Sequence, residues 1–149
     1  MYKHILIPTD GSPLSAKAIA AGVELAKAIG AKVTALFAAP APTPIVYENF
    51  LPVGYMAPDE HEAMVARAAK RYLGVAEAAA KAAGVPCETL TVTSEYPAET
   101  ILETAAKRRC DLIFMASHGR RGMQALLLGS ETQKVLAHAK TAVFVFRSR

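Results

Sequence analysis

Two short segments of this chain combine glycine with side chains that can hold an anion. Residues 8–12 read Pro-Thr-Asp-Gly-Ser, and residues 116–130 begin Ala-Ser-His-Gly-Arg-Arg-Gly and end in Gly-Ser. Glycine lets backbone N–H groups approach phosphate oxygens closely, and the N-terminus of a helix adds unpaired donors and the positive end of a dipole. The hydroxyl of Ser130 and the guanidinium of Arg120 suit the same purpose. These residue types point to a ligand that carries phosphate.

Other ways of handling phosphate are not indicated. The Walker pattern G-x-x-x-x-G-K-[ST] does not occur, and residues 93–94 are Thr-Ser where a receiver-type phosphoacceptor would have an aspartate. The sequence also shows no paired carboxylates and no nucleophile with an evident base. The sequence therefore favours a protein that is not an enzyme, with slow hydrolysis of a bound phosphate ligand beside Asp10 and His118 left open.

Five short apolar runs alternate with helical patterns, and this alternation predicts an α/β fold with a parallel sheet. The runs are residues 5–8, 32–38, 87–92, 112–116 and 142–146. The two glycine-containing segments directly follow the first and the fourth run. Ligands of open parallel sheets bind outside the carboxyl ends of the strands, so we expect the two segments to meet at one edge of the sheet.

Helices are expected to begin within or directly after both segments. Ser12 is the expected N-cap of the first helix, with Pro13 at its first position and Gly30 after its last turn. The fourth helix is expected to begin at Ser130, because Ser130-x-x-Gln133 has the spacing of a capping box. The Ser130 hydroxyl is thus assigned to the cap, a role compatible with phosphate binding.

The two remaining helices have simpler signals. The second is expected from about Asp59, with Glu62 as a capping-box partner, to Ala83, and the third from Pro97 onward. Residues 40–58 contain five prolines and are expected to form a long loop. Such a loop either acts as a lid or contact surface or packs over the core, and both interpretations stay open.

Length and composition describe an ordinary folded chain. With 149 residues, of which 52% are hydrophobic and 20% charged, it is expected to form one domain, residues 1–149. Cys87 and Cys110 stand outside any C-x-x-C pattern and are expected to be small core residues. The N-terminus lacks the apolar stretch of an export signal, so a cytoplasmic location is expected.

Composition also bears on partners. The chain has no run of 18 apolar residues, so no membrane partner is expected. The net charge is +4, but the basic residues form no stripe with interleaved aromatics, so no nucleic-acid partner is expected. The last apolar run would leave a sheet edge exposed, and a second copy of the chain could cover it.

Three motifs in order along the chain resemble the universal stress protein family: residues 5–12, residues 111–115 and the G-x9-G-S spacing of residues 119–130. The resemblance covers essentially the whole chain. It implies a three-layer α/β/α fold of the adenine nucleotide alpha hydrolase-like kind, with a five-stranded parallel sheet of order 3-2-1-4-5. It also implies homodimers paired through the last strand, Ala142–Phe146, and, in one large branch, ATP bound between strands one and four.

The same resemblance implies roles for individual residues. Asp10 would lie near the ribose or a magnesium ion brought by the nucleotide, and Ala38 and Met115 would lie beside the adenine. The residues expected to wrap the phosphates are Gly119, Gly129, Ser130, Glu131 and Thr132. The further residues expected to line the pocket are Pro8, Thr9, Ala116, His118 and Arg120.

One position departs from the family pattern. The nucleotide-binding branch has G-x2-G-x9-G-[ST], and Ala116 stands where its first glycine is expected. Alanine adds a methyl group and loses easy access to positive φ. Two functions therefore stay open: a regulatory or stress-protective protein that binds ATP, AMP or another adenine nucleotide, and a nucleotide-free dimeric interaction module of the same family.

Several of these residues also have simpler explanations. Asp10 has the position of an Asx-turn residue that opens the loop to the first helix. His118 has the character of a solvated loop histidine rather than an acid or base. Arg121 is expected to be solvated, whereas Arg120 is expected on the phosphate side.

Overall fold

The fold is taken from a computed structural model, which describes residues 1–148 except 43–45, 49–50, 54–55 and 120–126. Five strands form one parallel sheet in the spatial order β5-β2-β1-β6-β7. Their bounds are β1 His4–Thr9, β2 Lys32–Ala39, β5 Cys87–Thr93, β6 Leu112–Ala116 and β7 Ala142–Phe146. Counted along the chain within this sheet, the order is 3-2-1-4-5, as predicted.

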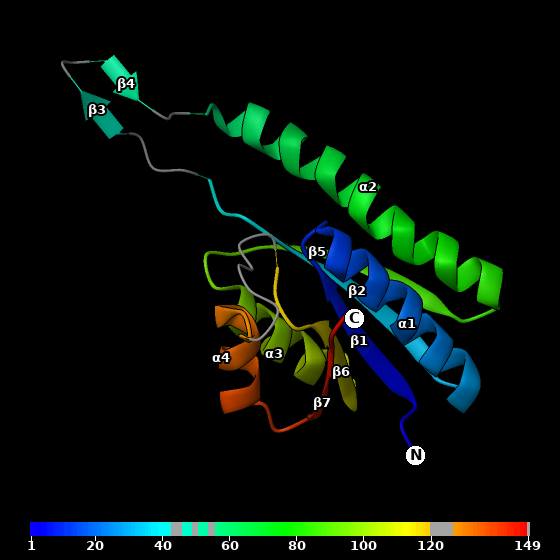
Figure 1. Cartoon of the computed structure of the whole chain (residues 1–149). Coiled ribbons are helices and arrows are strands. Elements are labelled where there is room, and N and C mark those ends of the chain that lie inside the picture. The colour runs from blue at the N-terminus through cyan, green and yellow to red at the C-terminus, as the bar shows by residue number, and fades with distance from the viewer. Residues whose placement is uncertain (43–45, 49–50, 54–55, 120–126, 149) are drawn as a thin grey trace.

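Four helices cover the two faces of the sheet. They are α1 Pro13–Ile29, α2 Pro58–Ala83, α3 Pro97–Lys107 and α4 Ser130–His138. Helices α1 and α2 pack on one face, and α3 and α4 pack on the other (Figure 1). The predicted three-layer α/β/α architecture is confirmed.

The central strands are apolar on both faces because helices bury both. Ile5 and Ile7 of β1 join the core under α1 and α2, whereas Leu6 between them joins the core under α3 and α4. All three side chains are fully buried. This two-residue alternation is that of a strand within a covered parallel sheet, and it explains why the sequence reads as a continuous apolar run.

The start and end of α1 follow the prediction. The Ser12 hydroxyl accepts a hydrogen bond from the N–H of Ser15 at 3.2 Å, and Pro13 occupies the first helical position. Gly30 ends the helix in the left-handed conformation, with φ +71°. Because the cap is placed directly after β1, it fixes where the chain turns at the carboxyl edge of the sheet.

Helix α4 begins at Ser130 as predicted, but the predicted cap is wrong. Gly129 is the N-cap, so the N-cap residue has no side chain to make a capping hydrogen bond. Gln133 does not complete a capping box, because its side-chain amide donates to the carbonyl oxygen of Leu128 at 2.8 Å. The N–H of Gly129 donates to Ser117 O at 2.7 Å, and this long-range bond sets where the helix begins.

The second helix also begins without a side-chain cap. It starts at Pro58 rather than Asp59, with Ala57 as N-cap, so the capping box expected with Glu62 does not form. Proline is favoured at the first helical position because its missing N–H would have no partner there anyway. Gly84 ends the helix in the left-handed conformation, as expected.

The long loop expected at residues 40–58 contains a hairpin that sequence reasoning missed. Strands β3 Val46–Glu48 and β4 Leu51–Val53 pair antiparallel. Figure 1 shows this hairpin beyond the start of α2, apart from the five-stranded sheet. Within the described parts of the chain, no helix is long and apolar enough to cross a membrane.

Candidate functional site

A pocket of about 1040 Å³ opens at the carboxyl edge of the sheet. It lies at the neighbouring strands β1 and β6. From β1 the following strands β2 and β5 lie to one side, and β6 and β7 lie to the other side. This reversal is a topological switch point, the place where open α/β sheets bind ligands. The volume is at the upper end of the roughly 300–1000 Å³ of small-molecule sites, so a nucleotide has ample room.

The turn after β1 is built by short-range hydrogen bonds. Asp10 Oδ1 accepts from the N–H of Ser12 at 2.9 Å, and Thr9 Oγ1 accepts from the N–H of Gly11 at 3.2 Å. The Asx-turn role proposed for Asp10 is therefore present. Gly11 has φ +78°, and a Cβ there would fall onto the ring of Tyr72 in α2, so only glycine suits this turn.

The turn after β6 is tied to the end of its strand at several points. The N–H of Ser117 donates to Phe146 O at 2.8 Å, which continues the pairing of β6 with β7. The Thr132 hydroxyl of α4 donates to Ala116 O at 3.0 Å. The first turn of α4 is thereby held against the carboxyl end of β6.

The two turns meet. A Cβ on Gly119 would contact the Oδ2 atom of Asp10, so these two residues lie against one another across the pocket. A Cβ on Gly129 would lie 3.0 Å from His118 Cα and 3.2 Å from His118 Cβ. A side chain at Gly119 would displace the Asp10 carboxylate, and one at Gly129 would press on the backbone of His118.

Twelve of the thirteen residues expected at the site line this one pocket, and the thirteenth, Arg120, lies outside the described residues together with Arg121. The twelve are Pro8, Thr9, Asp10, Ala38, Met115, Ala116, His118, Gly119, Gly129, Ser130, Glu131 and Thr132. The structure brings these side chains together, and their roles toward a ligand stay predictions.

Ala116 is the last residue of β6 and pairs with Phe146 of β7. Among the described non-glycine residues only Arg109 has a positive φ, so Ala116 has an ordinary backbone conformation. The loss of access to positive φ therefore causes no strain at this position. The remaining difference from the glycine of the family pattern is the methyl group of Ala116 at the pocket wall.

One wall of the pocket was not predicted. It is formed by residues of α2 that recur at helical spacing, namely Met64, Val65, Arg67, Ala68, Arg71 and Tyr72. No local signal indicated that residues 64–72 of α2 line the pocket, because this depends on tertiary packing.

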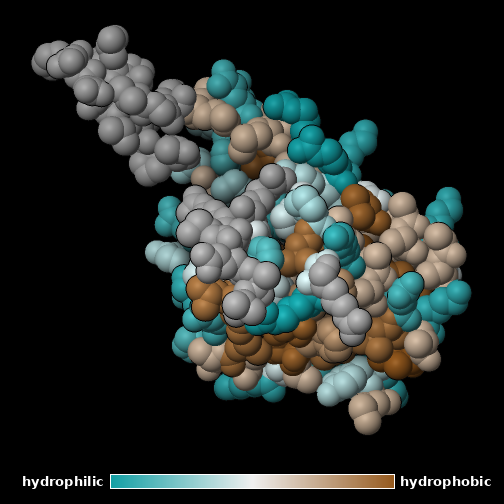
Figure 2. Space-filling model, in the orientation of Figure 1, coloured by the Kyte–Doolittle hydropathy of each residue, from teal (hydrophilic) through white to brown (hydrophobic). Residues whose placement is uncertain are grey.

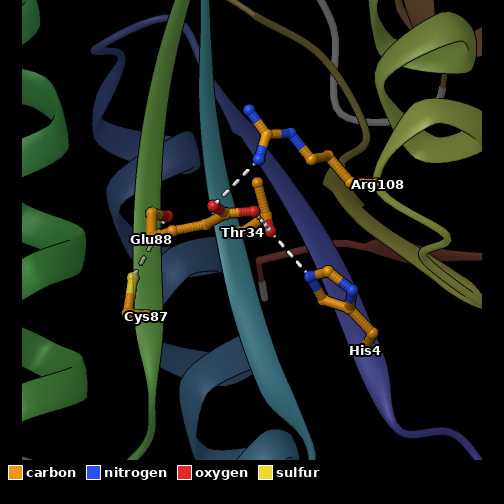
Figure 3. Close-up of polar contacts among 5 residues, drawn as sticks. All are labelled: His4, Thr34, Cys87, Glu88 and Arg108. Carbon is orange, nitrogen blue, oxygen red and sulfur yellow. Dashed lines mark hydrogen bonds and ion pairs between the residues drawn. The ribbon is translucent and has the colours of Figure 1, made fainter.

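A second polar cluster lies at the opposite, amino edge of the sheet. Figure 3 shows His4, Thr34, Glu88 and Arg108 pointing toward one another from β1, β2, β5 and the end of α3. The Thr34 hydroxyl donates its proton to Glu88 at 2.9 Å, so His4 Nε2, 2.6 Å away, is the protonated nitrogen that donates to Thr34. Arg108 pairs with the other Glu88 oxygen at 3.2 Å.

The ionisable side chains at this amino edge are not suited to acid–base or nucleophilic catalysis. Burial and the charge of Lys32 lower the pKa of His4 below its ordinary 6.5. Burial raises the pKa of the Cys110 thiol to about 11, and the Glu88 charge acts in the same direction. Within the described chain, every buried side-chain nitrogen and oxygen has a hydrogen-bond partner. The polar groups of this cluster bond to one another, and the cluster is a structural part of the fold.

Fold and pocket together define a parallel α/β protein with a glycine-lined cleft at its switch point. The sequence model of the Universal stress protein family matches residues 1–147, and the chain belongs to this family. A universal stress protein of Thermus aquaticus, encoded in the QAH/OAS sulfhydrylase 3' region, is 32% identical over 148 residues, which span 99% of this chain and 100% of that protein. Universal stress protein YxiE of Bacillus subtilis is 32% identical over 156 residues, with the same coverage.

Solved structures of the same family share the fold. UspA from Lactobacillus plantarum has a TM-score of 0.77 at 24% identity, covering 98% of both chains. A universal stress protein in complex with cAMP has a TM-score of 0.68 at 24% identity, covering 98% of this chain and 97% of the other. A universal stress protein from Archaeoglobus fulgidus in complex with dAMP has a TM-score of 0.61 at 16% identity, covering 97% of each.

Proposed function

We propose that this universal stress protein binds an adenine nucleotide, with ATP as the expected ligand, and acts as a regulatory or stress-protective protein of the cytoplasm. The observation that carries the proposal is the meeting of the two glycine-containing turns around one pocket, with Asp10 against Gly119. Two structural relatives are complexes with cAMP and dAMP, which supports adenine nucleotides as the ligand class.

The proposal gives each part of the pocket a task. The phosphates lie at Gly119, Gly129 and the first turn of α4, where backbone N–H groups meet the positive end of the helix dipole. The adenine lies beside Ala38 and Met115 at the ends of β2 and β6, because both residues line the pocket there.

Asp10 serves the ribose, or a magnesium ion that the nucleotide brings. Within the described residues no group of three metal-ligating side chains occurs. Magnesium commonly keeps several waters and uses one or two carboxylates with substrate phosphates, so a single carboxylate is enough only when the nucleotide supplies the rest. Asp10 therefore suits a nucleotide-borne ion.

Isothermal titration calorimetry tests the proposal directly. ATP with magnesium, AMP and cAMP are titrated separately into the purified chain, and mass spectrometry of the denatured protein reports any nucleotide retained through purification. Binding of at least one adenine nucleotide at micromolar to millimolar concentration is expected. No heat and no thermal shift with any of the three would overturn it.

The same chain has a surface suited to a homodimer. β7 is an edge strand of the sheet, and Phe144, 47% exposed, stacks on Phe114 with ring centroids 4.5 Å apart. Figure 2 shows apolar residues gathered on the side of the molecule where β6 and β7 lie. We infer that two copies pair through β7, since a second strand would cover both the edge and the ring.

Dimerisation is tested separately from nucleotide binding. Light scattering during gel filtration should give twice the chain mass, and Phe144→Lys should shift the protein toward monomer. If the dimer forms while no nucleotide binds, the chain is the nucleotide-free interaction module instead. A monomer at all concentrations would exclude pairing through β7.

A further inference from the structure

Five charged side chains line the described part of the pocket. Three are acidic, Asp10, Glu95 and Glu131, and two are basic, Arg67 and Arg71. Without the arginines the described wall would carry only negative charge, which would repel a polyphosphate. Within the described wall, Arg67 and Arg71 are therefore the side chains whose charge favours a strongly anionic ligand.

Glu131 is already neutralised from outside the pocket. Its Oε1 pairs with Lys134 at 3.2 Å, and its Oε2 accepts from the N–H of Ala98, at the start of α3, at 2.9 Å. The arginines are not needed for that carboxylate. Neither Arg67 nor Arg71 forms an ion pair with a described carboxylate. Their charge is available to a ligand.

Arg71 is exposed to solvent and contacts the neighbouring Tyr72. Its guanidinium lies 5.2 Å from the centroid of the Tyr72 ring, and Nη2 donates to the Tyr72 hydroxyl at 3.4 Å. Tyr72 in turn packs edge-to-face on Phe37 at the end of β2, with centroids 5.2 Å apart, and covers Gly11 in the turn after β1. Through Tyr72, Arg71 lies near the turn that carries Asp10.

Arg67 precedes Arg71 by four residues on α2. Residues at this spacing lie on one face of a helix, about 6 Å apart along its axis. Both line the pocket from α2, whereas Ser130 and Thr132 line it from α4 on the other side of the sheet (Figure 1). Two arginines that line the same pocket as a helix N-terminus match the charge of a chain of phosphates rather than of one.

We propose that Arg67 and Arg71 make the pocket selective for nucleotides with two or more phosphates over monophosphates and cyclic phosphates. The assignment rests on the proposed nucleotide function and deepens it. The phosphate next to the ribose lies at Gly119, Gly129 and the first turn of α4, and the phosphates beyond it extend toward α2, where the two guanidinium groups bind them. A single phosphate bound at α4 gains little affinity from the two guanidinium groups.

The test compares ligands as well as variants. ATP, AMP and inorganic tripolyphosphate are titrated calorimetrically into the wild type, Arg67→Gln, Arg71→Gln and the double variant. Lys70→Gln is the matched control, because Lys70 is exposed on the same helix, carries the same charge and does not line the pocket. Melting curves establish that all variants are folded.

Each arginine variant should weaken ATP and tripolyphosphate binding about tenfold, the loss of one charge-assisted hydrogen bond, while AMP changes by less than about threefold. Lys70→Gln should leave all three affinities unchanged. Equal losses for ATP and AMP, or losses matched by Lys70→Gln, would overturn the assignment.

The two proposals fail in distinguishable ways. If nucleotides bind and the ratio of ATP to AMP affinity does not depend on the arginines, only the selectivity assignment is wrong. If no nucleotide binds the wild type but tripolyphosphate does and needs the arginines, the nucleotide proposal is wrong and the arginines are a polyphosphate site. If none of the ligands binds the wild type, both proposals are overturned.

Discussion

The two ends of the sheet in this protein treat polar groups in opposite ways. At the amino edge, Thr34 links His4 to Glu88, and Asp111 accepts from the N–H groups of Lys3 and His4 at 2.9 and 3.0 Å. At the carboxyl edge, Gly119 and Gly129 bring the turns close together, and a pocket remains open beside them. The comparison teaches that a polar cluster alone does not mark a site. The candidate site lies where the protein leaves space.

The largest effect is expected from a side chain introduced at the carboxyl edge of the sheet, next to the pocket. Gly129→Val places a side chain where even a Cβ would lie 3.0 Å from His118 Cα, so the His118–Gly119 segment must move away from α4. We expect at least about a hundredfold loss of nucleotide affinity, or about 2.7 kcal/mol, measured by calorimetry.

Gly74→Val is the matched control for this change, because a Cβ on Gly74 meets nothing within 4 Å. The control should keep the wild-type affinity, and both variants should show cooperative melting. Unchanged affinity in folded Gly129→Val would place the phosphates elsewhere.

At the amino edge the reverse outcome is expected. Thr34→Val preserves shape but removes the hydroxyl that accepts from His4, and Thr34 is fully buried. A buried donor left without an acceptor costs about 1–3 kcal/mol, so the free energy of unfolding in urea should fall by that amount. Nucleotide affinity should not change. A stability equal to the wild type would show that water replaces the hydroxyl.

A pH series sharpens the same comparison. Because the pKa of His4 is lowered in the folded protein, the unfolded chain takes up a proton first as the pH falls. The stability contributed by neutral His4 is complete above the unfolded pKa of about 6.5 and is lost progressively below it. Urea midpoints at about pH 7.5 and about pH 5.5 should therefore differ more for the wild type than for His4→Gln. Equal differences would remove His4 as the cause.

The smallest effect is expected at Ala116. Its backbone is that of an ordinary strand residue, so glycine relieves no strain there. Ala116→Gly should lower the free energy of unfolding by about 0.5–1 kcal/mol through backbone entropy and change nucleotide affinity less than about twofold. Tighter binding by tenfold or more would show that the methyl group obstructs the ligand.

Sequence reasoning succeeded where a local signal and the tertiary structure agree. The strands Leu112–Ala116 and Ala142–Phe146 were predicted at their observed bounds, because both are short apolar runs with polar neighbours. The pocket-lining turns were predicted because they follow strands that a parallel topology must place side by side.

The errors came from contacts between distant segments. Gly129 rather than Ser130 caps α4, because a hydrogen bond to Ser117 decides where the helix begins. The hairpin of residues 46–53 was missed because Pro52 argues against a strand. Arg67 and Arg71 were missed because their position at the pocket depends on tertiary packing.

The glycine N-cap of α4 has a consequence for the exchange of the helix's amide hydrogens with solvent. The N-cap residue is Gly129, so no side chain of the cap accepts from the first amide hydrogens of α4. Deuterium should therefore enter α4 early in the free protein, and an anionic guest that accepts these hydrogens should slow the exchange. Because α4 leads directly into β7, a ligand in the pocket is expected to affect β7, the strand through which a second copy is expected to pair.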